Sequence, residues 1–113
     1  MNEEKNISLE EIARDLQSGF FSLQDLSEKR SWLAGEYFYL NAQLAEILKV
    51  KPAKWNELRR EAKSDASAER IWQATLDGLK EVELRLTLKS IEKMLSSIRT
   101  QIEIQLSELK MQI

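Results

Sequence analysis

Six basic side chains and one tryptophan lie close together in the sequence between positions 49 and 63. This stretch carries a net charge of +4, whereas residues 1–48 carry −5 and residues 64–113 carry −1. Lys and Arg neutralise phosphates, and an aromatic ring stacks on an unpaired base, so the combination suits single-stranded nucleic acid. The predicted nucleic-acid-binding residues are Lys49, Lys51, Lys54, Trp55, Arg59, Arg60 and Lys63.

The spacing of these residues leaves two interpretations open. Lys51, Trp55 and Arg59 are four residues apart and share one face if this stretch is helical. In the alternative, Trp55 and Leu58 turn toward the core, and the charged side chains form a solvated surface. The basic residues then still attract phosphate, but no base stacks on Trp55.

The sequence lacks two residue types that catalysis and metal binding often use. There is no Cys and no His, which excludes disulfides, thiol nucleophiles, the usual zinc sites and Ser-His or Cys-His catalysis. Glu81 lies four residues before Arg85, and other carboxylates alternate with basic residues in the same way, as on a solvated, salt-bridged helix face. We therefore expect a protein that is not an enzyme and has no cofactor and no metal.

Composition favours an all-α protein. The chain has 113 residues, of which 42% are hydrophobic, and three Gly and one Pro are too few turn residues for a β-sandwich or barrel. Its first residues are acidic and polar, and no apolar run reaches the roughly 18 residues of a membrane helix. We expect one helical domain over residues 1–113, a cytoplasmic location and no membrane partner.

Capping signals and apolar spacing predict helices at residues 9–18, 23–48, 52–63 and 68–112. Ser8 and Ser22 are each followed three residues later by an acidic residue, as at helix N-termini. Pro52 disfavours helical geometry in the residue before it, so one helix should end near Lys49 and another begin at Pro52. No Pro follows, so the last helix is expected to run without a break.

The last predicted helix carries an apolar seam with heptad spacing, which is typical of helix-on-helix packing. A helix over residues 23–48 spans only about 39 Å and cannot cover a partner of about 45 residues. Large uncovered apolar surfaces normally mark interfaces, so we predict a homo-oligomer, with a frayed C-terminal tail as the alternative. The predicted interface residues are Leu84, Leu88, Ile91, Leu95, Ile98, Ile102, Leu106 and Leu109.

A second apolar stripe precedes this seam on a different face of the same helix. Its members are Trp72, Leu76, Leu79, Val82 and Leu86. The helix is therefore expected to change partners between about residues 78 and 84.

Helix 23–48 contains two further features that predict contacts. Gly35 costs about 1 kcal/mol relative to Ala inside a helix, and close approach of another helix would explain it. Trp32, Phe38 and Tyr39 are expected to lie in the core or in an interface.

The order of elements resembles that of a family of small helical phage and prophage proteins. The segment YFYLNAQLAEILK leads into the basic KPAKWNELRREAK, followed by a polar break and ERIWQATLDGLKEVELRLTLKSIEKMLSSIRTQIE. Over residues 37–105 this arrangement is similar to the UvsY-type recombination mediators. The resemblance implies an oligomer that binds single-stranded DNA and helps to load a recombinase. The basic segment of that family would correspond to Lys49, Lys51, Lys54, Arg59, Arg60 and Lys63.

The sequence thus leaves two functions open. In the first, a phage-type accessory protein of recombination or replication binds single-stranded DNA through residues 49–63, assembles through residues 84–113 and acts with a recombinase or single-strand-binding protein. In the second, the chain is a non-enzymatic protein-binding module, such as an inhibitor, scaffold or assembly factor. There the coiled-coil seams are the functional surface, and the acidic residues 1–48 face a basic partner or mimic DNA.

Overall fold

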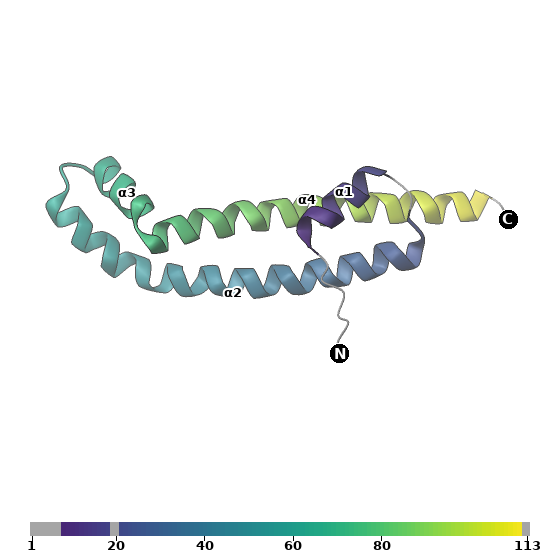
Figure 1. Ribbon diagram of the computed structural model, residues 1–113, viewed down its shortest axis with the longest axis horizontal. Helices are drawn as coiled ribbons and strands as arrows, with labels where there is room; N and C mark the ends of the chain where they lie inside the picture. The colour runs from purple at the N-terminus through teal and green to yellow at the C-terminus, as the bar shows by residue number, and fades with distance from the viewer. Residues whose placement is uncertain (1–7, 19–20, 112–113) are drawn as a thin grey trace. The chain divides into compact units, whose positions relative to one another are not determined.

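The computed structural model describes residues 8–18 and 21–111. Four helices make up this part of the chain: α1 (Leu9–Ser18), α2 (Leu23–Glu61), α3 (Asp65–Ala74) and α4 (Leu76–Met111) (Figure 1). No strand occurs among the described residues, so the predicted all-α class with a long C-terminal helix is confirmed. The last residue of the predicted helix 68–112 lies outside the described residues.

Serine side chains begin the first three helices. The Oγ atoms of Ser8, Ser22 and Ser64 each accept a hydrogen bond, at 3.1 Å, from the backbone N–H three residues further on. Each bond satisfies one of the N–H groups that lack an intrahelical partner in a first helical turn. The predicted starts of α1 and α2 are confirmed because this capping depends only on neighbouring residues.

Helix α2 continues through Pro52, so the predicted break near Lys49 is wrong. Proline inside a helix costs about 3 kcal/mol or more, because it lacks the N–H that would bond to the carbonyl four residues earlier. Pro52 and Leu48, whose carbonyl loses this bond, are both exposed residues, so water can replace the missing donor. The preceding residue, Lys51, is held by ion pairs with Glu81 and Glu69, which helps to keep it helical.

The predicted helix 68–112 is divided at Thr75, which ends α3 and begins α4. The Thr75 backbone, at φ −78° and ψ 164°, is extended rather than helical. Its N–H and hydroxyl both donate to the carbonyl of Trp72, at 3.0 and 2.6 Å. The same hydroxyl accepts from the backbone N–H of Gly78, at 3.0 Å, so one side chain caps both helices.

Gly78 allows the end of α3 to approach the first turn of α4. A Cβ atom at this position would lie 1.8 Å from the carbonyl oxygen of Trp72 and 2.8 Å from the Cα of Gln73. Heavy atoms that are not bonded cannot approach so closely, so only glycine fits. The close backbone contact explains the one glycine of this segment.

The chain divides into two compact units, and the expectation of one helical domain stays a prediction. The central unit comprises residues 37–89, and the terminal unit comprises residues 1–36 and 90–113. In the central unit, Figure 1 shows α3 turning back from the end of α2 toward the start of α4.

Each unit has its own apolar core. In the central unit, Leu44 of α2 packs with Leu84 and Leu88 of α4, flanked by partly buried side chains of α2. Those flanking residues are Tyr37, Leu40 and Ile47. Buried residues of the terminal unit come from α1, α2 and α4, namely Ile12, Leu26, Leu33, Ile91 and Ile98.

Candidate binding surfaces

Most of the basic residues between positions 49 and 63 are paired with carboxylates of their own chain. Lys51 Nζ lies 3.1 Å from Glu81 Oε1 and 3.9 Å from Glu69 Oε2. Lys54 Nζ lies 2.6 Å from Asp77 Oδ2. The carboxylates come from α3 and α4, more than ten positions further along the chain, so their approach depends on the fold of the central unit.

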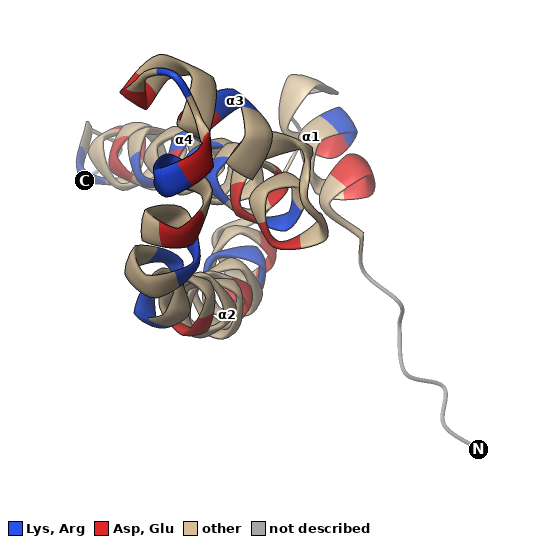
Figure 2. Cartoon of the chain, turned by 90° about the vertical axis from the view of Figure 1, so that its left-hand side faces the viewer, with Lys and Arg blue, Asp and Glu red and all other residues tan. Residues whose placement is uncertain are grey.

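Two further pairs involve residues closer in sequence. Arg59 Nε donates to Asp65 Oδ1 at 2.6 Å, and Lys49 Nζ lies 3.5 Å from Glu46. Figure 2, which looks onto this unit, shows acidic and basic segments interspersed along α2 and α3. A carboxylate beside each of these cations repels a phosphate, so the positive charge in the sequence does not become an equally positive surface.

The remaining predicted nucleic-acid-binding residues are Trp55, Arg60 and Lys63. Arg60 and Lys63 are exposed and form no ion pair within the part of the chain that the structure describes. Trp55 is half-buried, and its Nε1–H donates to Glu69 Oε1 at 3.2 Å. Among these predicted residues the structure therefore leaves two cations without a described ion pair, one in the last turn of α2 and one just after it, with a tryptophan that is partly covered.

A buried ionic network lies where α2, α3 and α4 meet, and Lys51 is its one member among the predicted site residues. Glu81 is only 7% exposed and accepts hydrogen bonds from Trp72 Nε1 at 2.8 Å and Arg85 Nε at 2.9 Å. The Lys51 ammonium lies 3.1 Å from this carboxylate and 5.5 Å from the centroid of the Trp72 ring. The sequence predicted the Glu81–Arg85 pair, but placed it on a solvated surface.

The pKa of Glu81 reflects two opposing effects. Burial alone raises the pKa of this carboxyl, but hydrogen bonds from Trp72, Arg85 and Lys51, together with the charge of Lys51, outweigh burial and lower the pKa below its ordinary value. The carboxylate is therefore ionised at neutral pH and joins the three helices. Because its donors all belong to the protein framework, we assign it a structural role.

The lowered pKa predicts how stability depends on pH. A carboxyl group whose pKa is lower in the folded state stabilises the fold above its unfolded pKa, about 4.3 for Glu, and loses that contribution as the pH falls through the folded value. We expect Glu81→Gln to be less stable than the wild type at pH 7, with a difference that shrinks toward pH 3. Urea unfolding followed by circular dichroism at both pH values measures it. An unchanged difference would contradict the assigned role of the charge.

No group of three or more potential metal ligands occurs among the described residues. In the same part of the chain, no helix has a stretch long and apolar enough to cross a membrane.

The predicted oligomer interface is only partly available on the surface. Leu84, Leu88, Ile91 and Ile98 are at most 5% exposed within the single chain, so for these four the prediction of an uncovered seam is wrong. Leu95 and Ile102 are half-buried. Leu106 and Leu109 are exposed at 46% and 49%.

Helix lengths explain this correction. Because α2 continues through Pro52, it has 39 residues and spans about 58 Å. The break at Thr75 shortens α4 to 36 residues, or about 54 Å. Each unit contains part of α2 and part of α4, so the buried members of the seam are covered within the single chain, and the length argument no longer applies to them.

The earlier stripe, in contrast, lies on the surface of α4. We define the α4 stripe as Leu76, Leu79, Val82 and Leu86, which are exposed at 87%, 55%, 41% and 63%. The break at Thr75 separates Trp72 from this stripe and turns it into the core, where it is 1% exposed. The stripe lies on the side of α4 away from Leu84 and Leu88, so the core of the central unit does not use it.

Two aromatic residues of α2 also lie on the surface of the central unit. Phe38 is 73% exposed and Tyr39 is 62% exposed, so neither is a core residue as the sequence allowed. Trp32, in the terminal unit, is half-buried. Exposed aromatic side chains are typical of protein interfaces and agree with the interface alternative.

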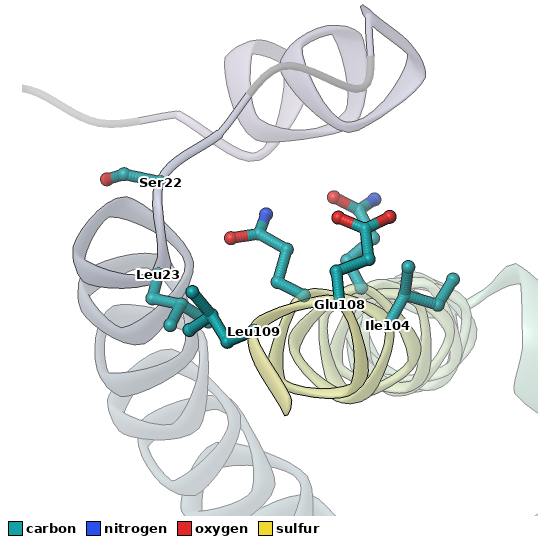
Figure 3. A pocket seen from close by; sticks show the side chains of 7 residues that line it. Ser22, Leu23, Ile104, Glu108 and Leu109 are labelled. Carbon is teal, nitrogen blue, oxygen red and sulfur yellow. The ribbon is translucent and has the colours of Figure 1, made fainter. Parts of the chain in front are cut away.

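An open groove in the terminal unit lies between the start of α2 and the end of α4. It has a volume of about 710 Å³. Figure 3 shows Leu23 and Leu109 approaching each other along one wall, with Glu108 and Ile104 on α4. Gln105 Nε2, another lining residue, donates to the carbonyl of Phe21 at 2.7 Å. This lining offers shape and a few amide groups but no acid–base pair.

Comparison of the chain with protein-family models, with characterised proteins and with solved structures finds no match. The resemblance to UvsY-type mediators therefore stays a prediction, and the candidate function depends on the surfaces described above.

Proposed function

We propose that this chain is a non-enzymatic protein-binding module that uses the α4 stripe as its binding surface. The observation that carries the proposal is the exposure of all four large apolar side chains of the stripe, in the regular spacing of a helix that packs against another helix. Contiguous apolar surface of this kind normally marks an interaction site.

The ion pairs of the basic segment support this function over DNA binding. Four of its six cations have carboxylate neighbours within 4.0 Å. Two of them, Lys51 and Lys54, connect α2 to α4, so they contribute to the fold that presents the stripe. Among the described residues, in contrast, all four members of the apolar stripe stay exposed.

A photo-crosslinking amino acid placed at Leu79 tests the proposed function in cells that naturally produce the protein. We expect covalent adducts that protease removes and nuclease does not. Ala53, which is exposed on α2, is the matched control position and should give few adducts. Adducts that nuclease removes, or equal yields at Leu79 and Ala53, would contradict a protein partner for the stripe.

A second candidate function is that of a phage-type recombination accessory protein that binds single-stranded DNA. It is favoured by Arg60 and Lys63, which are exposed and unpaired among the described residues. Trp55 lines an open pocket of about 450 Å³ beside Lys51 and Pro52. A base entering this pocket would contact one side of the indole ring.

This second function predicts salt-dependent binding of a labelled oligonucleotide in fluorescence anisotropy. If it is correct, Arg60→Ala with Lys63→Ala should abolish most binding at low salt, since these cations need not leave a carboxylate to meet a phosphate. Lys54→Ala is the comparison variant, because its ammonium is already paired with Asp77 and should contribute less. No binding by the wild type at low salt would exclude this candidate.

A further inference from the structure

We propose that the α4 stripe pairs with the same stripe of a second copy of this chain, with the two helices antiparallel. This inference rests on the proposed function and names its partner. It concerns Leu79, Val82 and Leu86, together with the charged residues Lys80 and Glu83 beside them. All five side chains are exposed in the single chain.

The apolar positions interdigitate when the stripe is paired with its own copy. Consider an antiparallel pair whose two-fold axis lies level with residues 81 and 82. Each residue of one helix then faces the residue of the other helix for which the two residue numbers add up to about 163, so that residue 80, for example, faces residue 83. Leu79 of one helix then lies between the levels of Val82 and Leu86 of the other, and the two Val82 side chains lie side by side near the axis. This alternation buries all six apolar side chains in one continuous layer.

The charges next to the stripe complement each other in the same arrangement. Lys80 and Glu83 are three residues apart on one flank of the stripe, and an antiparallel two-fold pair brings identical flanks together. Lys80 of each copy therefore meets Glu83 of the other, which gives two symmetry-related ion pairs. Neither residue forms an ion pair within the described part of its own chain, so both are free for this contact.

A parallel pair would be less favourable. It would bring opposite flanks together, so that Lys80 and Glu83 of one copy would both lie beside the flank that carries Arg85 and Lys89 of the other, where Glu83 is attracted but Lys80 is repelled. Like charges across an interface disfavour association. Only the antiparallel pair brings each Lys80 onto a Glu83 with no like-charge contact on that flank, and this favours the antiparallel orientation.

Two charge-reversal variants test whether the partner is a second copy and whether the two helices are antiparallel. In Lys80→Glu, the facing residues would both be acidic, and in Glu83→Lys they would both be basic, so each variant alone should self-associate less than the wild type. A mixture of the two variants restores opposite charges in every facing pair. We expect the mixture to associate at least about tenfold more tightly than either variant alone, as measured by sedimentation with one variant labelled.

Circular dichroism confirms that both variants keep their helix content, which we expect because the substituted residues are exposed. A mixture that associates no more tightly than its components would overturn the antiparallel pair, as would a wild type that stays monomeric at high micromolar concentration. If the wild type is monomeric while Leu79 crosslinks to a different protein, self-pairing is wrong and the proposed function stands. Nuclease-sensitive adducts would overturn the proposed function itself.

Discussion

Gly78→Ala is expected to destabilise the protein by about 3 kcal/mol or more. The new Cβ would overlap the carbonyl oxygen of Trp72, which lies 1.8 Å from its position, and also the backbone of Gln73. Both neighbours are main-chain atoms, so no side-chain rotation can relieve the overlap. The C-terminal end of α3 must move away from α4, which also disturbs the Trp72–Glu81 hydrogen bond. Thermal unfolding should show a midpoint lowered by more than about 10 °C.

Gly35→Ala is the matched control for this substitution. Gly35 is exposed inside α2, and no described atom outside its own turn of helix lies within 4 Å of its added Cβ. The close approach of another helix expected from the sequence is therefore not found there. Alanine should stabilise the protein by about 0.5–1 kcal/mol, because glycine loses more backbone freedom on folding. Equal losses for both variants would contradict the steric explanation for Gly78.

Trp72→Ala is expected to cost about 3–5 kcal/mol, as for other fully buried aromatic side chains. Trp72 is 1% exposed, and its removal leaves a cavity at the junction of three helices. It also removes the donor that bonds to Glu81 at 2.8 Å, so a carboxylate that is 7% exposed loses one of its hydrogen bonds. Urea unfolding monitored by circular dichroism measures the loss without depending on tryptophan emission.

Comparison of Trp55→Ala with Trp72→Ala separates the effect of burial on stability from the effect of losing a Trp–Glu hydrogen bond. Trp55 also donates to a glutamate, Glu69, but it is only half-buried. We expect a loss of less than half that of Trp72→Ala, because less apolar surface leaves the core and water can replace the donor. A loss at Trp55 that equals the loss at Trp72 would show that the hydrogen bond rather than burial dominates at both positions.

Several elements could be predicted because their causes are local. The starts of α1 and α2 depend on serine side chains bonded to N–H groups three residues away. The heptad seam of α4 also marked buried residues correctly in Leu84, Leu88, Ile91 and Ile98. What the pattern could not supply was the partner that covers them, because apolar spacing identifies a face but not the surface against it.

The candidate site was predicted unevenly for the same reason. Charge clustering between positions 49 and 63 is a property of the sequence, but the carboxylates that neutralise it come from α3 and α4. Glu81 reads as one member of an alternating charged face, and no local signal distinguishes it from Glu83, which is exposed. The α4 stripe was visible as a second apolar face, but only the break at Thr75 separated its exposed members from buried Trp72.

The sequence by itself determined the helical class, the helix starts that serine caps create, and the apolar faces, because each depends on residues within a few positions of one another. The tertiary structure decided two boundaries against the local signals. Helix α2 continues through Pro52, next to the Lys51–Glu81 contact, and the last helix breaks at Thr75, where Gly78 admits the backbone of α3. Contacts between residues distant in the sequence, or between two backbones, outweighed propensities worth about 1–3 kcal/mol. These two boundaries determine which apolar surface is covered and which is left exposed.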